Sequence, residues 1–385
     1  MQYFFNEQQQ MIKSLARRIA AERILPVRAE LDEKEEFPWD IMRELANADM
    51  FRVFIPEQYG GIGGGCLNLC LVIEELSRVC AGIAISYAAD ALGCLPLLEY
   101  STEEQKRKYL PDVASGDKLT AFALTESTAG SDASGIKTSA IRERGYYILN
   151  GTKQFITNGG EAEVYIVVAM TDPAKGSRGA SALVVEKGTP GFSFGKKEKK
   201  MGIRSSATRE LVFRDCRVPE ENLIGREGMG FIITMRTIDR SRPGVGAQAV
   251  GIAQGALEAA VEYAQKRIQF GHPVSSFQAI QHMLANMAIE LEAARVMVYA
   301  VARTIDAGTK NFTEEAAMAK VFATDMAMRV TTDAVQIFGG VGYMRDYPIE
   351  KMMRDAKITQ IYEGTNQVLR NAIALELLKR KAIRE

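Results

Sequence analysis

The segment Tyr146-Tyr-Ile-Leu-Asn-Gly-Thr-Lys-Gln-Phe-Ile156 decides how the rest of the chain is interpreted. β-Branched and aromatic residues stand on both sides of Asn150-Gly151, a dipeptide that favours a tight turn between antiparallel strands. We therefore predict a β-hairpin that turns at this dipeptide. Additional strands are predicted at Val164–Ala169, Ala182–Glu186 and Glu210–Phe213. Together these segments are expected to form a compact β-barrel or sandwich in the middle of the chain.

Helical periodicity governs the sequence on both sides of this β region. Apolar residues recur three or four positions apart from Asn6 to about residue 114, and again from Phe231 onward. Long Ala- and Met-rich helices, which pack as bundles, are predicted at Ala247–Lys266, Gln278–Ala307, Thr313–Phe338 and Gln367–Lys379. The predicted fold class is α+β and multi-domain, with an N-terminal α-helical domain (1–117), a middle β domain (118–228) and a C-terminal four-helix bundle (229–385).

Composition excludes several classes of function before any motif is considered. The 385 residues contain 48 Lys+Arg and 48 Asp+Glu, and this zero formal charge argues against a nucleic-acid partner. With only two histidines, no metal site is expected. The five cysteines form no CxxC pair and fit free thiols in a reducing compartment. No apolar run approaches the roughly 20 residues of a membrane span, and the N-terminus lacks the features of a targeting peptide. We expect a cytoplasmic protein without a membrane span.

The common phosphate-binding loops do not fit this sequence. Gly244-Val-Gly-Ala-Gln-Ala249 matches the GxGxxA pattern of dinucleotide-binding proteins. However, that pattern needs a preceding strand, whereas here Arg242-Pro243 precedes it and a long helix follows. The glycines of Gly60–Gly65 have the wrong spacing, and they are better explained as a connector.

Three other stretches combine polar groups with glycine. Phe122-Ala-Leu-Thr-Glu-Ser-Thr-Ala-Gly-Ser-Asp132 is a hydroxyl-rich loop that suits a polar ligand, although, taken alone, a serine-rich turn is the favoured explanation. Lys153-Gln-Phe-Ile-Thr-Asn-Gly159 places an aromatic ring and a hydroxyl at the end of a strand. In Ile361-Tyr-Glu-Gly-Thr-Asn-Gln367, the carboxylate of Glu363 is either an exposed capping acid or a group that a ligand approaches closely over the adjacent glycine.

Read in order, these and other motifs resemble the acyl-CoA dehydrogenase family, flavoproteins that form the α,β double bond of acyl-CoA thioesters. The motifs are Tyr-Gly-Gly (59–61), Leu-Thr-Glu-x-x-Ala-Gly-Ser-Asp (124–132), Phe-Ile-Thr-Asn-Gly (155–159), Met-Gly-x-Arg (201–204), Arg-x-x-Phe-Gly (267–271), Phe-Gly-Gly-x-Gly (338–342), Arg-Asp-Ala-Lys-Ile (354–358) and Tyr-Glu-Gly-Thr (362–365). The resemblance extends over essentially the whole chain. It implies the same helix–sheet–helix order, with FAD bound between the β domain and the bundle.

The resemblance also implies which residues bind FAD. Near the flavin ring it places Phe122, Leu124, Thr125, Phe155 and Thr157, although many relatives carry tryptophan at position 155. Arg267 and Phe270 would reach the pyrophosphate and adenine from a neighbouring subunit, since a permanent cation suits a diphosphate. The alternative for Arg267 is an ordinary surface charge. The remaining implied cofactor positions are Gln278, Gln336, Gly340, Thr365 and Gln367.

For catalysis, the resemblance implies Glu363 as the base that removes the α-proton while the β-hydride moves to flavin N5. Such a carboxylate needs a raised pKa, which a water-poor acyl pocket supplies. Ser241 stands where some relatives carry a glutamate, so no second base of that kind is expected. The implied substrate-binding residues include Ser131, Asp239, Arg242, Tyr362 and Gly364. An electron-transfer flavoprotein as electron acceptor and a homotetramer are implied as well.

Asp90 is an unusual residue within an apolar segment, Ser86-Tyr-Ala-Ala-Asp-Ala-Leu-Gly93. In the family this helix lines the acyl tail, and an unpaired buried carboxylate is unfavourable. Asp90 either turns to solvent or to a basic partner, or it faces the substrate and serves a polar, branched or cyclic acyl group. An acyl-CoA oxidase and a non-catalytic flavin-binding homologue are further alternatives, and the presence of Glu363 argues against the second.

Overall fold

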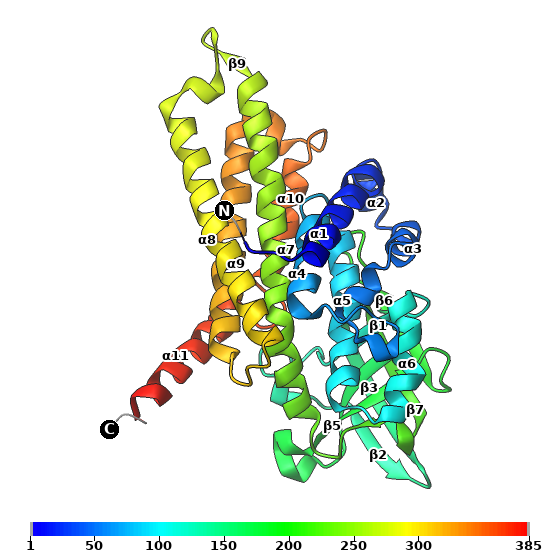
Figure 1. The fold of residues 1–385 in the computed structure, drawn as a ribbon. Coiled ribbons are helices and arrows are strands. Elements are labelled where there is room, and N and C mark those ends of the chain that lie inside the picture. The colour runs from blue at the N-terminus through cyan, green and yellow to red at the C-terminus, as the bar shows by residue number, and fades with distance from the viewer. Residues whose placement is uncertain (1–2, 383–385) are drawn as a thin grey trace.

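The computed structural model describes residues 3–382, and its chain passes from helices to a sheet and back to helices (Figure 1). The N-terminal helices are α1 (Glu7–Ile19), α2 (Arg28–Lys34), α3 (Trp39–Asn47), α4 (Gly65–Ser77), α5 (Ala81–Tyr100) and α6 (Glu103–Ser115), with a π-helical turn at Ala20–Ile24. α1 begins where an amide side chain satisfies the free N–H groups of its first turn. Asn6 accepts a hydrogen bond from the backbone N–H of Gln9 (2.8 Å), and the Gln9 side chain accepts one from the backbone of Asn6.

Eight strands form the sheet of the middle region. They are β1 (Thr120–Ala123), β2 (Ser139–Glu143), β3 (Tyr146–Thr157), β4 (Val164–Met170), β5 (Ala180–Glu186), β6 (Phe192–Lys197), β7 (Thr208–Pro219) and β8 (Leu223–Ile224). Their order is β6-β7-β3-β2-β4-β5-β8, and β1 pairs in parallel with β4. The loop that follows β1 lies beside β3, because the backbone N–H of Gln154 donates to the Thr125 carbonyl at 2.8 Å, and two of the glycine-containing stretches thereby come together.

The predicted hairpin at Asn150-Gly151 is wrong. β3 runs through this dipeptide without turning, and the hairpin turn lies at Arg144-Gly145, where Glu143 pairs with Tyr146. At the dipeptide the pairing with β7 shifts register instead, as in a β-bulge. A Cβ atom on Gly151 would come within 2.7 Å of the Cα atom of Thr138, so glycine is required by this close approach rather than by a turn.

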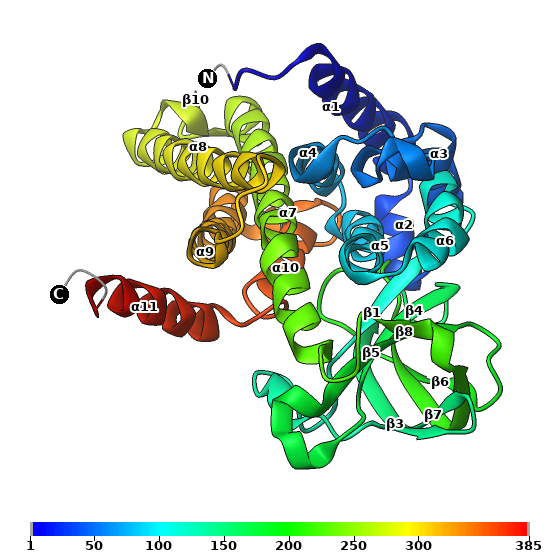
Figure 2. The same cartoon turned by 60° about the horizontal axis from the view of Figure 1, so that its bottom comes forward.

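The C-terminal region contains α7 (Gly230–Lys266), α8 (Gln278–Asp306), α9 (Thr313–Phe338), α10 (Ile349–Thr359) and α11 (Asn366–Ala382). Two short strands, β9 (Ile268–Gln269) and β10 (His272–Pro273), form the tip between α7 and α8. Helices α7 to α10 lie side by side, whereas α11 projects away from the body (Figures 1 and 2). The predicted α–β–α fold class is confirmed. However, α7 starts well before the predicted Ala247, and α10 was not predicted.

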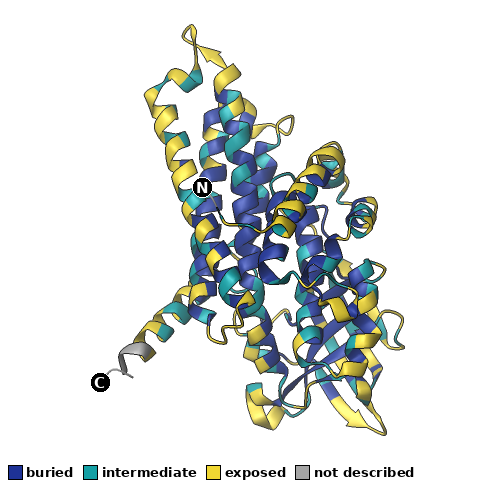
Figure 3. Ribbon diagram, in the orientation of Figure 1, coloured by how far each residue is buried: buried dark blue, intermediate teal, exposed yellow. Residues whose placement is uncertain are grey.

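Helix α5 is the centre of the N-terminal core. Within residues 3–382 it is the one helix long and apolar enough to cross a membrane, with a mean hydropathy of 1.5, so the expectation that no run approached this length is wrong. However, 83% of its apolar window is buried inside the protein (Figure 3). It packs against α4, α6, α7 and β1, as a core helix does.

Candidate active site

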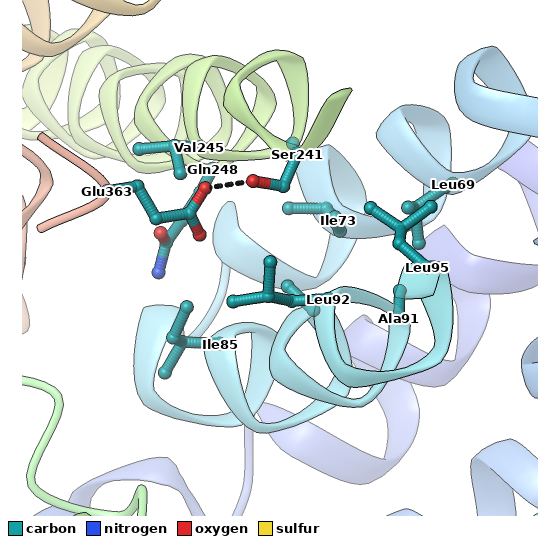
Figure 4. A pocket seen from close by; sticks show the side chains of 12 residues that line it. Leu69, Ile73, Ile85, Ala91, Leu92, Leu95, Ser241, Val245, Gln248 and Glu363 are labelled. Atoms are coloured by element: carbon teal, nitrogen blue, oxygen red, sulfur yellow. Dashed lines mark hydrogen bonds between the residues drawn. The ribbon is translucent and has the colours of Figure 1, made fainter. Parts of the chain in front are cut away.

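An apolar pocket lies between α4, α5 and α7, beside the loop that joins α10 to α11 (Figure 4). Its walls are formed by Leu69 and Ile73 of α4, by Ile85, Ala88, Ala91, Leu92 and Leu95 of α5, and by Ser241, Gly244, Val245 and Gln248 of α7, with Glu363 from the loop. Four of the α5 residues recur at three- and four-residue spacing, so they share one face of the helix. Ile73, Ile85, Val245 and Gln248 are buried, whereas Leu69, Leu92 and Leu95 are partly exposed, so the first group marks the inner end of the pocket.

Glu363 directs its carboxylate into this pocket from a left-handed turn. Its φ is 54°, and that of Gly364 is 96°. The Ser241 hydroxyl donates a hydrogen bond to Oε2 of Glu363. Burial raises the pKa of Glu363 above its usual value, although this hydrogen bond and the positive charges of Lys320 and Arg242 oppose the shift. A carboxylate with a raised pKa in an apolar pocket is suited to remove a proton from carbon.

The loop that carries Glu363 is tied to the neighbouring helices. The Lys320 ammonium of α9 donates hydrogen bonds of 2.9 Å to the Gly364 carbonyl and to Oδ1 of Asn366. The Tyr362 hydroxyl donates to Oε1 of Gln248 at the inner end of the pocket. Sequence reasoning missed Lys320. The signal that could have found it is its spacing, because it lies one turn from both Ala316 and Thr324 on the buried face of α9.

Asp239 and Arg242 form a buried ion pair on α7, next to Ser241. The Thr313 hydroxyl donates to Oδ2 of Asp239 at 2.6 Å and fixes the second carboxylate oxygen. Burial lowers the pKa of Arg242, and its Nε has no hydrogen-bond partner among the described residues. This predicted pair therefore lies next to the pocket, whereas the predicted Ser131 is exposed on the loop after β1.

A second ion pair, which sequence reasoning also missed, supports the loop that follows β1. Lys153 of β3 is fully buried, and it donates to the Leu124 carbonyl (2.9 Å) and to Glu126 (2.8 Å). Glu126 also accepts a hydrogen bond from the backbone N–H of Thr138 at 2.9 Å. The signal was the alternation of β3, which places Lys153 on the buried side of the strand. The loop conformation is thereby fixed against the strand that carries the predicted flavin residues.

The residues at this edge of the sheet fit a flavin ring. Phe155 has a left-handed backbone (φ 59°), and its side chain is 57% exposed although it lies in a β-strand. Thr157, two residues later, and Thr125 on the adjacent loop are half-buried, as is Phe122 of β1. The exposed ring of Phe155 can pack against the face of a flavin, and the hydroxyls of Thr125 and Thr157 can form hydrogen bonds with its edge.

Five of the other predicted cofactor residues form a separate group that is distal to the pocket. Arg267, Phe270, Gln278, Gln336 and Gly340 are exposed at the end of the bundle where α7 and α9 finish, whereas Thr365 and Gln367 lie near the start of α11, beside the loop that carries Glu363. An α-helix rises 1.5 Å per residue, so Arg267 lies about 39 Å along α7 from Ser241. One chain therefore does not bring the distal group to its own pocket.

The expectation that Asp90 faces the substrate is wrong. It is two residues from both Ala88 and Leu92, so it lies on the opposite side of α5 from the pocket. Its Oδ1 accepts a hydrogen bond from the backbone N–H of Thr120 in β1 at 2.6 Å, and the Thr120 hydroxyl donates to the Asp90 carbonyl at 2.5 Å. The carboxyl is fully buried, and burial raises the pKa of Asp90 to about 8. The alternatives of solvent or a basic partner are also wrong, because the end of the sheet supplies a backbone donor.

Comparison with protein-family models assigns this fold and pocket to one family. The acyl-CoA dehydrogenase N-terminal domain matches residues 6–117, the middle domain residues 121–216 and the C-terminal domain residues 228–378. The chain therefore belongs to the acyl-CoA dehydrogenase family of FAD-dependent enzymes, as the sequence motifs implied.

Three solved structures show the extent of this similarity. Butyryl-CoA dehydrogenase from Megasphaera elsdenii is 48% identical, with a TM-score of 0.96 over 98% of this chain and 100% of that one. A chain solved in work on the electron transferring flavoprotein of Acidaminococcus fermentans and on flavin-based electron bifurcation is 51% identical, with a TM-score of 0.96 and the same coverage. The acyl-CoA dehydrogenase of Bacillus anthracis complexed with FAD is 36% identical, with a TM-score of 0.92 over 99% of this chain and 68% of that one.

Proposed function

We propose that this enzyme dehydrogenates a short, straight-chain acyl-CoA to the 2-enoyl-CoA, with Glu363 as the base that takes the α-proton. The observation that carries this assignment is the Glu363 carboxylate, which points into an apolar pocket and has a pKa raised by burial. The similarity to butyryl-CoA dehydrogenase supports a short acyl group.

Each part of the pocket has a role in this reaction. The apolar walls exclude water, which keeps the pKa of Glu363 raised and strengthens electrostatic interactions with the substrate. Ser241 orients the carboxylate by its hydrogen bond. The left-handed turn at Glu363 and Gly364 leaves the Glu363 backbone N–H available to the thioester oxygen, an oxyanion-type contact. The Asp239–Arg242 pair, with Ser131 on the opposite loop, would bind the CoA portion.

FAD, when bound, would supply the hydride acceptor at its N5 atom. Thr125, Thr157 and Phe155 would hold its ring at the edge of the sheet. Fixing the base and substrate in one geometry contributes on the order of 7–11 kcal/mol to lowering such a barrier. The chain's own contribution is therefore to position the thioester, exclude water and hold the α-proton acceptor in place.

The inner end of the pocket supports the proposed chain length. Ile73 and Ile85 close it with branched side chains, and Gln248 is held there by Tyr362. An acyl chain that enters past the partly exposed Leu92 and Leu95 would meet this wall soon after passing Glu363.

We also propose a homotetramer that exchanges electrons with an electron-transfer flavoprotein. The separation of about 39 Å between Arg267 and Ser241 supports binding of the pyrophosphate by a neighbouring subunit. The related chain from work on the Acidaminococcus fermentans electron transferring flavoprotein supports the redox partner.

Replacing the base tests the mechanism directly. We expect Glu363→Gln to retain FAD but to slow anaerobic bleaching of the flavin by butyryl-CoA by roughly 10³-fold or more, because a neutral amide does not accept the proton. Ser241→Ala is the control, and it should bleach far faster than Glu363→Gln because its carboxylate remains. Bleaching of Glu363→Gln at the wild-type rate would remove Glu363 from the mechanism. Oxygen consumption during wild-type turnover would identify an oxidase instead.

A further inference from the structure

Lys320 is a fully buried lysine on α9 that faces the catalytic loop. Its ammonium contacts the loop at two points, the Gly364 carbonyl and Oδ1 of Asn366, both at 2.9 Å. Asn366 in turn donates to the Thr324 hydroxyl (2.9 Å) and to Asp325 (2.8 Å), one turn further along α9. The segment that follows Glu363, from Gly364 to Asn366, is thus held by hydrogen bonds to α9.

The charges around Lys320 couple it to the base. Glu363 and Asp325 attract its ammonium, and Arg242 repels it. Burial lowers the pKa of Lys320 to about 7, so the group is positively charged at lower pH. Burying an ammonium is unfavourable, and an apolar side chain of similar length would fill the same space at lower cost. Packing alone therefore does not account for a lysine at this position.

We propose that Lys320 is a positioning residue of the reaction: it fixes the Glu363–Gly364 turn through two hydrogen bonds and favours the ionised form of the base. This inference rests on the proposed role of Glu363. Lys320 does not touch the pocket, and it acts through the loop.

Three variants of the flavin-loaded enzyme separate these contributions. Lys320→Met removes both the charge and the hydrogen bonds, whereas Lys320→Gln removes the charge and keeps an amide donor. Thr324→Val is the matched control, because it removes the neutral hydroxyl that Asn366 contacts and leaves the charge of Lys320 in place. For each variant the rate of anaerobic flavin bleaching by butyryl-CoA is measured across pH, together with KM, FAD content and the thermal unfolding midpoint.

We expect Lys320→Met to lower kcat by roughly 10- to 100-fold at pH 7, with a small change in KM, because the base is misplaced. The acid limb of the pH profile should move to higher pH in Lys320→Met and Lys320→Gln. Without the positive charge the carboxylate of Glu363 is less stabilised, so its pKa rises. Thr324→Val should keep the wild-type acid limb even if its unfolding midpoint falls.

An acid limb that stays at the wild-type pH in Lys320→Gln, whose FAD content serves as the test of folding, would overturn the proposal. An equal shift in Thr324→Val would also overturn it, because the effect would then be structural. Wild-type bleaching by Glu363→Gln would instead show that the base itself is misassigned, so the two failures are distinguishable.

Discussion

Two carboxyl groups near the apolar pocket, Asp90 and Glu363, share a raised pKa but differ in what they face. Burial raises the pKa of both. The Asp90 carboxylate accepts a hydrogen bond from the backbone N–H of Thr120. The Glu363 carboxylate faces the pocket and accepts a hydrogen bond from the Ser241 hydroxyl. The direction in which each carboxylate points favours Glu363, and not Asp90, as the proposed base.

Asp90→Asn tests this distinction at the level of stability. The folded-state pKa of Asp90, about 8, lies above the ordinary value of 3.8, so its favourable contribution is complete below about pH 4 and is lost as the pH rises to about 8. The asparagine keeps an oxygen for the Thr120 N–H and does not ionise. We therefore expect the variant to gain roughly 3–4 kcal/mol in unfolding free energy, relative to wild type, between pH 5 and pH 8.

Urea unfolding of both proteins at the two pH values measures this gain. The preference among butyryl-, isovaleryl- and cyclohexanecarboxyl-CoA should stay unchanged, because Asp90 does not line the pocket. A stability difference that does not vary with pH, or an altered acyl preference, would contradict the assigned role.

At the scale of single elements, the face of a helix and the path of a strand were the hardest features to predict. The sequence predicted α9 at its observed bounds, Thr313–Phe338, because its periodicity is regular. For α5, apolar residues surround the whole helix, so periodicity did not indicate which face meets the pocket. At Asn150-Gly151 the local turn preference was overridden by the long pairing of β3 with β7, which tolerates the dipeptide as a bulge.

The pocket face of α5 gives a prediction on substrate length. Ile85→Ala removes three carbon atoms from the inner end of the pocket, so the ratio of kcat/KM for hexanoyl-CoA to that for butyryl-CoA should rise roughly tenfold. Steady-state kinetics with both thioesters measure the ratio. Ile83→Ala is the matched control, since Ile83 is equally buried on α5 but does not line the pocket. Equal ratios in the two variants would place the inner wall elsewhere.

At the scale of the whole molecule, the single chain leaves features that only an assembly would explain. The predicted cofactor residues at the end of the bundle lie far from the pocket, and Phe270 among them is 89% exposed. Large apolar side chains are also exposed on the outer helices, including Ile289 of α8 and Leu375 and Leu378 of α11. Periodicity in the sequence predicted these helices, but it does not report the distance between two groups of residues.

The proposed tetramer has a mass and a cofactor requirement that can be measured. Light scattering should give about 170 kDa, four times the 42.4 kDa chain. Arg267→Glu should weaken FAD retention on dialysis, because a cation that meets the pyrophosphate becomes an anion. Arg18→Glu, on the exposed side of α1, is the control and should retain FAD. A 42.4 kDa particle that keeps its FAD would show that a single chain binds the whole cofactor.

The left-handed backbone at Glu363 has a consequence for the evolutionary history of such a chain. A non-glycine residue in that conformation costs about 1–2 kcal/mol, and the buried carboxylate adds a further penalty. Glycine at position 363 would relieve both. In a duplicated copy freed from selection for turnover, random substitution would therefore tend to remove the base while the fold persisted. In such a copy, loss of the proposed base would not be opposed by a loss of stability.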